Sequence, residues 1–336
     1  MTLRIPFTRR MMLAGCSAAA LLAALPPGAA HAQSAAAYPD RPLTVVVPYT
    51  PGGQFDNHGR LLAARMAILL NQSVVVENRP GAGTTIGAEY VARAKPDGYT
   101  MLMAGATMFT IAPHTFGSLR YKIEDFQTVS TINMQPMALM INPTALPVKN
   151  LAEYVAYAKA NPDKINFATT GPGVATHLLG ELTKARLGLD IVPVHYKGTG
   201  PGMIDLLAGR VQSTFDGLLA YLPMLKAGKA LALAISSETR LPGAPDIPTF
   251  TEMGYPDLAM SSWAGIVVPR GTPAAIVDKL HRTVVEVVNN EEVKNRMIAD
   301  VTVPMSRTPQ EFDALIKRDF ETWGALIKRI GGIKIQ

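Results

Sequence analysis

The chain has 336 residues, with 32 basic and 26 acidic side chains, a formal net charge of +6 and a single cysteine. A chain of this length can form two domains with buried cores. The basic excess is modest and forms no cluster, so the composition argues against a nucleic-acid-binding protein. The 28 glycines and 26 prolines fit an α/β protein with many defined turns.

The first 32 residues have the pattern of a cleavable signal peptide. Arg4, Arg9 and Arg10 precede an apolar stretch rich in Ala and Leu, and Ala30-His31-Ala32 fits a small-x-small cleavage site. The stretch is shorter than the roughly 20 residues that span a bilayer, which argues against a membrane anchor. The adjacent arginines also fit a twin-arginine signal, so the route of export stays open. We therefore expect the protein to leave the cytoplasm.

The single cysteine, Cys16, lies inside this leader. Leu13-Ala14-Gly15-Cys16 is similar to the box at which bacterial lipoproteins are cleaved, but the apolar core before it is too short for us to expect lipidation. Cleavage after Ala32 would leave 304 of the 336 residues, with no cysteine among them. It would lower the net charge from +6 to +3, because three arginines and no acidic residue are removed. Disulfides, thiol catalysis and Cys-ligated zinc would then be excluded.

Eight β-rich runs alternate with helical stretches along most of the chain. This alternation is the pattern of an α/β protein with a mostly parallel sheet and helices on both faces. We expect strands at 43–47, 73–77, 99–104, 138–142, 191–194, 211–215, 231–236 and 264–268. We expect helices near 56–70, 84–95, 151–160, 175–187, 200–208, 273–289 and 309–330.

Two Pro-rich passages, near residues 135–138 and 242–262, separate the predicted strands into two groups. This division predicts two lobes, with residues 38–137 and 262–336 in lobe 1 and residues 138–261 in lobe 2. Ligands of such folds bind between the lobes.

The first of four glycine-containing turns, turn 1 (residues 49–56), joins a predicted strand to a helix. Gly52 and Gly53 leave backbone N–H groups unpaired at the helix start, so that the turn can hold a small anion without Lys or Arg. Phe55 either stacks on a flat ligand or packs beneath the loop. Asp56 lies in the first turn of the helix, where it either braces the loop or contacts the ligand.

Turn 2 (residues 77–85) also has glycines before a helix. Gly83 and Gly87 are four residues apart, so the spacing misses the dinucleotide G-x-G-x-x-G pattern and a nucleotide cofactor is not supported. Thr84 and Thr85 offer hydroxyls at the helix start. Thr84 either caps the helix or contacts the ligand.

Turn 3 (residues 169–177) and turn 4 (residues 195–202) precede helices in the predicted lobe 2. Thr176 and Thr199 offer hydroxyls, and Lys197 offers a positive charge, although long lysine side chains are usually solvated. All four turns stand at the carboxyl ends of predicted strands, so we expect them to meet at one cleft.

Signatures of metal binding and catalysis are weak. His177 and Glu181 are four residues apart on one predicted helix face, but no third ligand of suitable spacing is near them. The G-x-S-x-G, H-E-x-x-H and P-loop patterns are absent from the sequence. We therefore expect neither a metal nor a cofactor. An exported enzyme that uses Asp56, His177 or Asp216 as an acid or base stays an alternative.

Three ordered strings occur at these turns: Pro48-Tyr49-Thr50-Pro51-Gly52-Gly53, Glu77-Asn78-Arg79-Pro80-Gly81-Ala82-Gly83 and Tyr196-Lys197-Gly198-Thr199-Gly200-Pro201. With them, the chain resembles the substrate-binding receptors of tripartite tricarboxylate transporters, the Bug family. The resemblance covers nearly all of the chain after the leader.

The resemblance implies an α/β, two-lobed periplasmic binding protein, type II-like, with a ligand cleft between the lobes. It implies a receptor, not an enzyme, that captures a small organic acid and delivers it to the membrane permease subunits of a transporter. Backbone amides and ordered waters at turns 1 and 2 would hold the ligand carboxylate, and turns 3 and 4 would complete the cleft. We expect a periplasmic monomer without a nucleic-acid partner. A receptor that feeds a membrane signalling sensor is a further alternative.

Gln54-Phe55 departs from many relatives, which carry a small residue and Thr there. Phe55 leaves open whether the ligand is a larger or aromatic carboxylate or a short dicarboxylate. The residues that we assign to the ligand site are Tyr49, Gly52, Gly53, Gln54, Phe55, Asp56, Ala82, Gly83, Thr84, Thr85, Thr107, Pro172, Thr176, His177, Tyr196, Lys197, Gly198, Thr199 and Asp216.

Overall fold

The computed structural model describes residues 38–329 and 331–332. The predicted signal peptide, with its arginine pair and Cys16, lies outside these residues. The chain divides into residues 1–40, of which only Tyr38, Pro39 and Asp40 are described, and residues 41–336, which hold the helices and strands. None of the described helices combines the length and apolar character that a membrane span requires.

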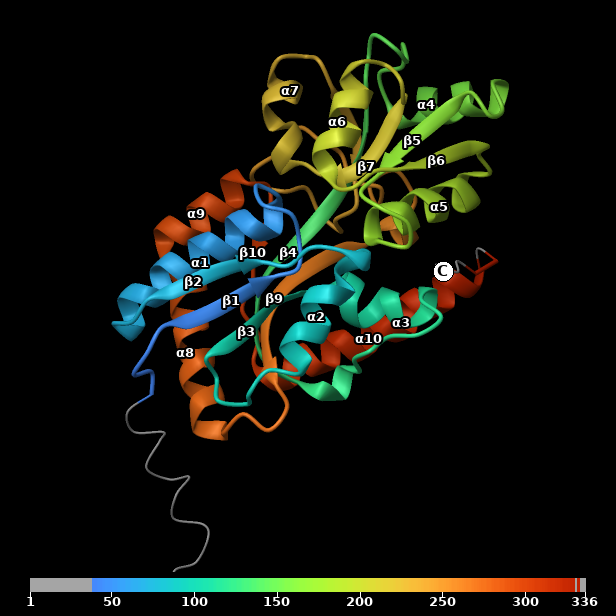
Figure 1. The fold of residues 1–336 in the computed structure, drawn as a ribbon. Helices are drawn as coiled ribbons and strands as arrows, with labels where there is room; N and C mark the ends of the chain where they lie inside the picture. Colours follow the sequence, from blue (N-terminus) through green and yellow to red (C-terminus); the bar gives the residue numbers. More distant parts are fainter. Residues whose placement is uncertain (1–37, 330, 333–336) are drawn as a thin grey trace, which may run out of the picture. The chain divides into compact units, whose positions relative to one another are not determined.

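Helices and strands alternate through most of this larger unit (Figure 1). The strands are β1 (Leu43–Val47), β2 (Val74–Asn78), β3 (Thr100–Gly105), β4 (Phe126–Ile141), β5 (Ile165–Thr169), β6 (Ile191–His195), β7 (Ser213–Gly217), β8 (Leu231–Ile235), β9 (Ser261–Pro269) and β10 (Val303–Pro304). The α-helices are α1 (Gln54–Leu70), α2 (Thr85–Ala92), α3 (Ala112–Thr115), α4 (Leu151–Ala160), α5 (Ala175–Leu187), α6 (Thr199–Leu207), α7 (Leu222–Lys226), α8 (Ala274–Asn289), α9 (Glu291–Ala299) and α10 (Pro309–Arg329). The predicted α/β class is confirmed.

The strands form a sheet in the order β2-β1-β3-β9-β4-β7-β5-β6, and β8 and β10 also pair with β4. The outer pairs β1–β2, β1–β3, β5–β6 and β5–β7 are parallel, as expected for strands joined through helices. The pairs that involve β4 or β9 are antiparallel. The long strands β4 and β9 therefore join two sets of parallel strands.

Strand β4 connects the two sets because it changes partners along its length. Its first part, up to Pro136, pairs with β9, and its second part, from Met137, pairs with β7 and β8. We call this change of partners the β4 crossover, the first set (β1, β2, β3, β9, β10) the first strand group and the second (β5, β6, β7, β8) the second strand group. The sequence pattern predicted only the second part of β4.

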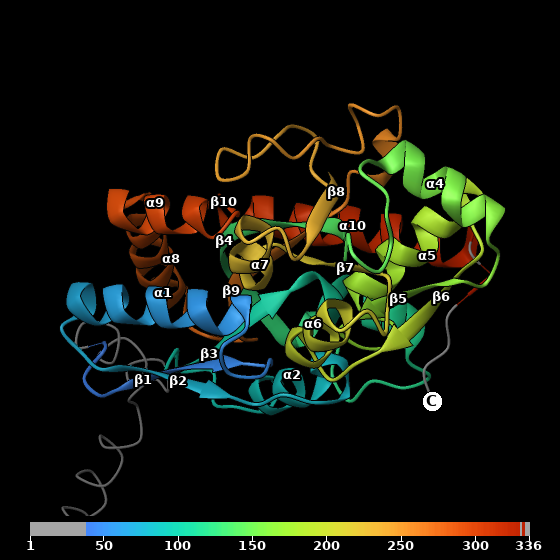
Figure 2. The same cartoon turned by 90° about the horizontal axis from the view of Figure 1, so that it is seen from above.

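Two clusters of buried apolar side chains lie on the two strand groups. One contains Val46, Trp263 and Phe312, and the other contains Phe167, Phe215 and Trp323. Helix α10 thus packs its first half into one cluster and its second half into the other. Figures 1 and 2 show α1, α8 and α9 beside the first strand group, and α4, α5 and α6 beside the second. Burial of these side chains supplies most of the free energy that holds the layers together.

Candidate functional site

Four helices begin directly after the carboxyl ends of parallel strands. Turn 1 leads from β1 to α1, turn 2 from β2 towards α2, turn 3 from β5 to α5 and turn 4 from β6 to α6. The residues at the N-cap positions are Gly53, Thr84, Val174 and Gly198, and none of them forms a side-chain cap. The N–H groups of the first helical turns therefore lack this source of acceptors, and they carry the positive end of the helix dipole.

Asp56 holds turn 1 in place. Its carboxylate is 2 % exposed and accepts hydrogen bonds from Gly52 N–H (2.9 Å), Arg60 Nε–H (3.0 Å) and Asn78 Nδ2–H (2.8 Å). Burial tends to raise the pKa of Asp56, but the bonds from Arg60, Gly52 and Asn78 outweigh burial and lower it. The carboxylate is thus occupied by donors of its own chain, which fits the bracing role more closely than ligand contact.

Asn78 ties turn 1 to turn 2. It ends β2, and its side-chain amide donates to Asp56 Oδ1 and to the backbone oxygen of Tyr49 (3.1 Å). Behind it, Gly87 of α2 packs so closely on Pro48 that an added Cβ would lie 2.7 Å from the Pro48 Cβ. The absence of a side chain at Gly87 lets the two turns lie side by side.

Phe55 packs against the residues of its own loop. Its ring stacks on Tyr49, with centroids 4.1 Å apart and an angle of 19° between the planes. It also covers Gly105, where an added Cβ would lie 2.8 Å from Phe55 Cζ. Burial raises the pKa of Tyr49, and a hydrogen bond with Thr107 opposes that rise. The geometry favours packing over an open platform for a ligand.

Turn 2 has a strained backbone. Four consecutive residues have positive φ: Gly81 (129°), Ala82 (44°), Gly83 (60°) and Thr84 (82°). A β-branched residue rarely adopts this conformation. Thr84 is also 5 % exposed, and its hydroxyl has no hydrogen-bond partner. Thr84 occupies the N-cap position of α2 but caps nothing, whereas the Thr85 hydroxyl donates to Ala82 O (2.9 Å).

Turn 3 repeats the bracing geometry of turn 1 with a histidine. His177 Nδ1 accepts a hydrogen bond from Gly173 N–H (3.0 Å), as Asp56 does from Gly52, with the same spacing of four residues. This bond requires Nδ1 to be unprotonated. Burial, and to a smaller extent His195, lowers the pKa of His177 to about 4. Thr176 in the same turn bonds to Thr170, with 2.9 Å between the two hydroxyl oxygens.

Turns 3 and 4 are joined by main-chain bonds. Tyr196 N–H donates to Thr169 O (3.0 Å), and Gly198 N–H donates to Thr170 O (3.2 Å). The Tyr196 hydroxyl donates to Asp205 Oδ2 (2.8 Å), so it is occupied within its own segment. Among the predicted residues, Gly52, Ala82, Pro172 and Lys197 are exposed on their turns.

Two close approaches connect the first strand group with the second. An added Cβ on Gly198 would lie 3.6 Å from Thr50 Oγ1, and one on Gly217 would lie 2.5 Å from Gln54 Oε1. Asp216 adjoins the second contact. Burial raises its pKa to about 6, against hydrogen bonds that include one from Thr199. The four turns and Asp216 are therefore linked through these contacts into one region.

Sequence reasoning missed several residues that build this region: Asn78, Gly87, Gly105, Thr170 and Gly217. Asn78 carried a usable signal, since it directly follows the predicted strand 73–77 at the start of turn 2. The glycines carried none, because their value depends on side chains distant in sequence. Within residues 38–329 and 331–332, no group of three or more His, Cys, Asp or Glu side chains is arranged to hold a metal ion.

Comparison with known proteins identifies the family. A family model described as the tripartite tricarboxylate transporter family receptor matches residues 59–332. Protein BugT of Bordetella pertussis is 35% identical over 306 residues, which cover 90% of this chain and 94% of that protein.

Comparison with solved structures agrees with this family match. The periplasmic binding protein BugD superposes with a TM-score of 0.82 at 36% identity, over 89% of this chain and 100% of that one. An R. palustris protein with adipate gives 0.85 at 32% identity, over 89% and 100% of the two chains. MatC from Rhodopseudomonas palustris with bound malate gives 0.79 at 32% identity, over 86% and 100%. The predicted periplasmic binding protein fold is confirmed. Because the family and these neighbours are binding receptors and not enzymes, the chain is a binding protein that belongs to the tripartite tricarboxylate transporter receptor family.

Proposed function

We propose that the protein is a periplasmic receptor that binds a small organic acid at turns 1 to 4 and delivers it to the membrane permease subunits of a tripartite transporter. Structural neighbours that carry adipate and malate support a carboxylate as the ligand. Uncapped helix N-termini support an anion, because their N–H groups and dipoles attract negative charge.

The backbone conformation and the buried, unpaired hydroxyl of Thr84 are the observations that best support the proposal. A β-branched residue at a φ of 82° costs about 1–3 kcal/mol, and a buried hydroxyl without a partner adds a desolvation cost. Such a residue persists where another interaction compensates for it. A ligand carboxylate oxygen that accepts from the Thr84 hydroxyl would supply that interaction. The strain and the unpaired hydroxyl occur at the start of an uncapped helix, where an anion is favoured.

The remaining assignments belong to the same proposal. Asp56 and His177 act as braces of turns 1 and 3, Gln54 closes the region from α1, and Thr199 and Asp216 close it from the second strand group. Residues 38–137 with 262–336 form lobe 1, residues 138–261 form lobe 2, and the ligand lies between them. Residues 1–32 direct export, and the receptor acts as a monomer.

Ligand identification on the freshly purified, undenatured protein tests this function. Native mass spectrometry shows whether an acid is retained, and calorimetry with aliphatic and aromatic mono-, di- and tricarboxylates measures its affinity. We expect saturable binding of at least one acid, together with a rise in the unfolding temperature. The primary amide of the same acid, which has nearly the same shape but no charge, is the matched control. Binding of sugars or cations alone, or equal binding of acid and amide, would contradict the proposal.

A further inference from the structure

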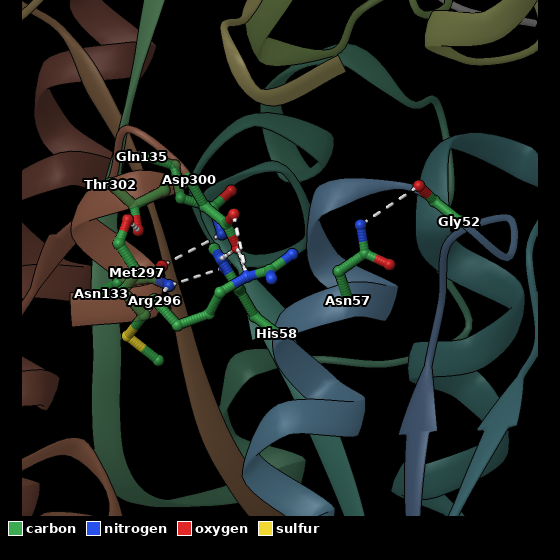
Figure 3. Close-up of polar contacts among 9 residues, drawn as sticks. All are labelled: Gly52, Asn57, His58, Asn133, Gln135, Arg296, Met297, Asp300 and Thr302. Carbon is green, nitrogen blue, oxygen red and sulfur yellow. Dashed lines mark hydrogen bonds and ion pairs between the residues drawn. The ribbon is translucent and has the colours of Figure 1, made fainter. Parts of the chain in front are cut away.

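A buried polar network lies beneath α1, outside the four turns. We call it the His58 network; it consists of His58, Asn133, Gln135 and Asp300 (Figure 3). His58 is fully buried on α1, and Asn133 and Gln135 are buried on β4. His58 Nδ1 lies 2.9 Å from Asn133 Nδ2, and His58 Nε2 lies 3.3 Å from Asp300 Oδ2.

The hydrogen bonds of this network fix which side-chain atoms donate and which accept. Gln135 Nε2–H donates to Asn133 Oδ1 (3.1 Å), so the Asn133 amide group turns its N–H towards His58. His58 Nδ1 must then accept, which leaves the proton on Nε2, facing Asp300. The contact between Nε2 and Asp300 has no aligned hydrogen bond, so it is mainly electrostatic. Arg296, 3.2 Å from Asp300 Oδ1, balances the charge of the carboxylate from the solvent side.

The network joins three parts of the fold. Asn133 and Gln135 lie just before the β4 crossover, next to a shift in the β4–β9 register. Asp300 follows α9, and the next residue, Val301, packs in a cluster with Ile235 and Leu241, near the second strand group. His58 thus connects α1 to the crossover and to a corner that contacts the other half of the molecule.

His58 also lies one helical turn from the ligand region. Gln54 is four residues before it, and side chains at this spacing share a helix face. Gln54 contacts Gly217, which pairs with Met137 at the start of the second part of β4. One face of α1 therefore makes two contacts. His58 contacts β4 just before the crossover, and Gln54 contacts β7, which pairs with β4 just after the crossover.

We propose that the His58 network is a positioning contact that holds the first turn of α1, and with it turn 1, in register with the β4 crossover. The proposal rests on the proposed function only in that turn 1 contacts the ligand. Residues that link a site to another part of the fold without ligand contact typically change affinity by roughly 3- to 30-fold when replaced. His58, Asn133 and Asp300 belong to this class.

Amide hydrogen exchange and ligand affinity test the proposal together. His58→Phe keeps a ring but removes both nitrogens, Asp300→Asn removes the charge, and His58→Gln restores one donor and one acceptor. We expect faster exchange at Gly52 to Asp56, and adipate or malate binding weakened roughly 3- to 30-fold, in the first two variants. His58→Gln should recover part of both.

His281→Gln is the matched control. His281 Nδ1 bonds to Val129 O, so it too joins a helix to β4, but at the far end of the strand. We expect it to lower stability without changing exchange at turn 1. Unchanged exchange in His58→Phe and Asp300→Asn, or the same change in His281→Gln, would overturn the proposal. If His58→Phe does not fold, Asp300→Asn decides. If the wild-type protein binds no carboxylate, the proposed function fails, while the exchange measurement still decides this inference.

Discussion

Helices that start at the four turns differ from several of those that start elsewhere. Gly53, Thr84, Val174 and Gly198 provide no side-chain cap for α1, α2, α5 and α6. By contrast, Asn150 caps α4 by accepting from Glu153 N–H (2.9 Å), and Asn290 caps α9 by accepting from Glu292 N–H (3.1 Å).

An N-cap side chain typically stabilises a protein by about 1 kcal/mol. Four helices without one therefore sacrifice stability at one region, whereas α4 and α9 keep it. Under the proposed function, the N–H groups at the turns would bind the ligand anion in place of a capping side chain. Braces replace the caps there: Asp56 and His177 fix Gly52 and Gly173, outside the helices, and leave the first helical turns open.

The largest expected effect is on how the unfolding free energy depends on pH, and it comes from His177 and Asp216, at the second strand group. His177 has a folded pKa of about 4 against 6.5 unperturbed, so its contribution to stability is present above pH 6.5 and is lost as pH falls towards 4. Asp216 has a folded pKa of about 6 against 3.8, so its contribution is present below pH 3.8 and is lost as pH rises through 6. Each amounts to at most about 3 kcal/mol, and the two offset each other.

Single substitutions should separate the opposite pH dependences that His177 and Asp216 give to the unfolding free energy. In Asp216→Asn, the free energy of unfolding should rise between pH 4 and 6.5; in His177→Gln, it should fall over the same interval. Urea unfolding at four pH values measures both, with the wild-type protein as the reference. Parallel pH profiles for the two variants would show that neither residue titrates as its burial implies.

Thr84→Val should weaken ligand binding by about tenfold to a hundredfold, because it removes one hydrogen bond to a charged group. The unfolding free energy should stay level or rise slightly, since the buried hydroxyl has no partner in the protein. Calorimetry and urea unfolding measure the two quantities. Thr85→Val is the matched control, because the Thr85 hydroxyl already donates to Ala82 O. Equal losses of affinity in both variants would point to general damage to turn 2.

Adding an N-cap side chain to α1 should make its start resemble the capped starts of α4 and α9. Gly53 has a φ of −75° and a ψ of 170°, which any residue adopts, so Asn fits there. In Gly53→Asn, the side-chain oxygen would accept from the first-turn N–H groups, raise stability by a few tenths of a kcal/mol and weaken ligand binding about tenfold.

Asn150→Gly provides the reverse change at α4. It should lower the unfolding free energy by a few tenths of a kcal/mol and leave affinity unchanged, since α4 starts away from the turns. Calorimetry on both variants gives the comparison. Full affinity in Gly53→Asn would mean that the ligand does not use the α1 amides.

Local sequence patterns predicted the glycine turns because each depends on a strand, a turn and a helix that are adjacent in the chain. The first part of β4 was not predicted, because Ser130, Asn133 and Gln135 are polar yet buried. Their partners are distant: Ser130 Oγ–H donates to Arg307 O, 177 residues away. The contacts of Gln54 with Gly217 and of Thr50 with Gly198 have the same origin. The left-handed backbone at Thr84 could not be predicted either, because a β-branched residue rarely adopts it.

Phe55→Leu should have only a small effect on ligand selectivity and tests whether Phe55 contacts the ligand. The stacked pair of Phe55 and Tyr49 contributes about 0.5–1.5 kcal/mol beyond burial, so stability should fall by about 1 kcal/mol. Because the ring covers Gly105 and Tyr49, the ratio of affinities for benzoate and adipate should stay within about twofold of the wild-type ratio. A larger shift towards adipate would mean that Phe55 contacts the ligand, and that turn 1 selects it through a side chain as well as through its backbone.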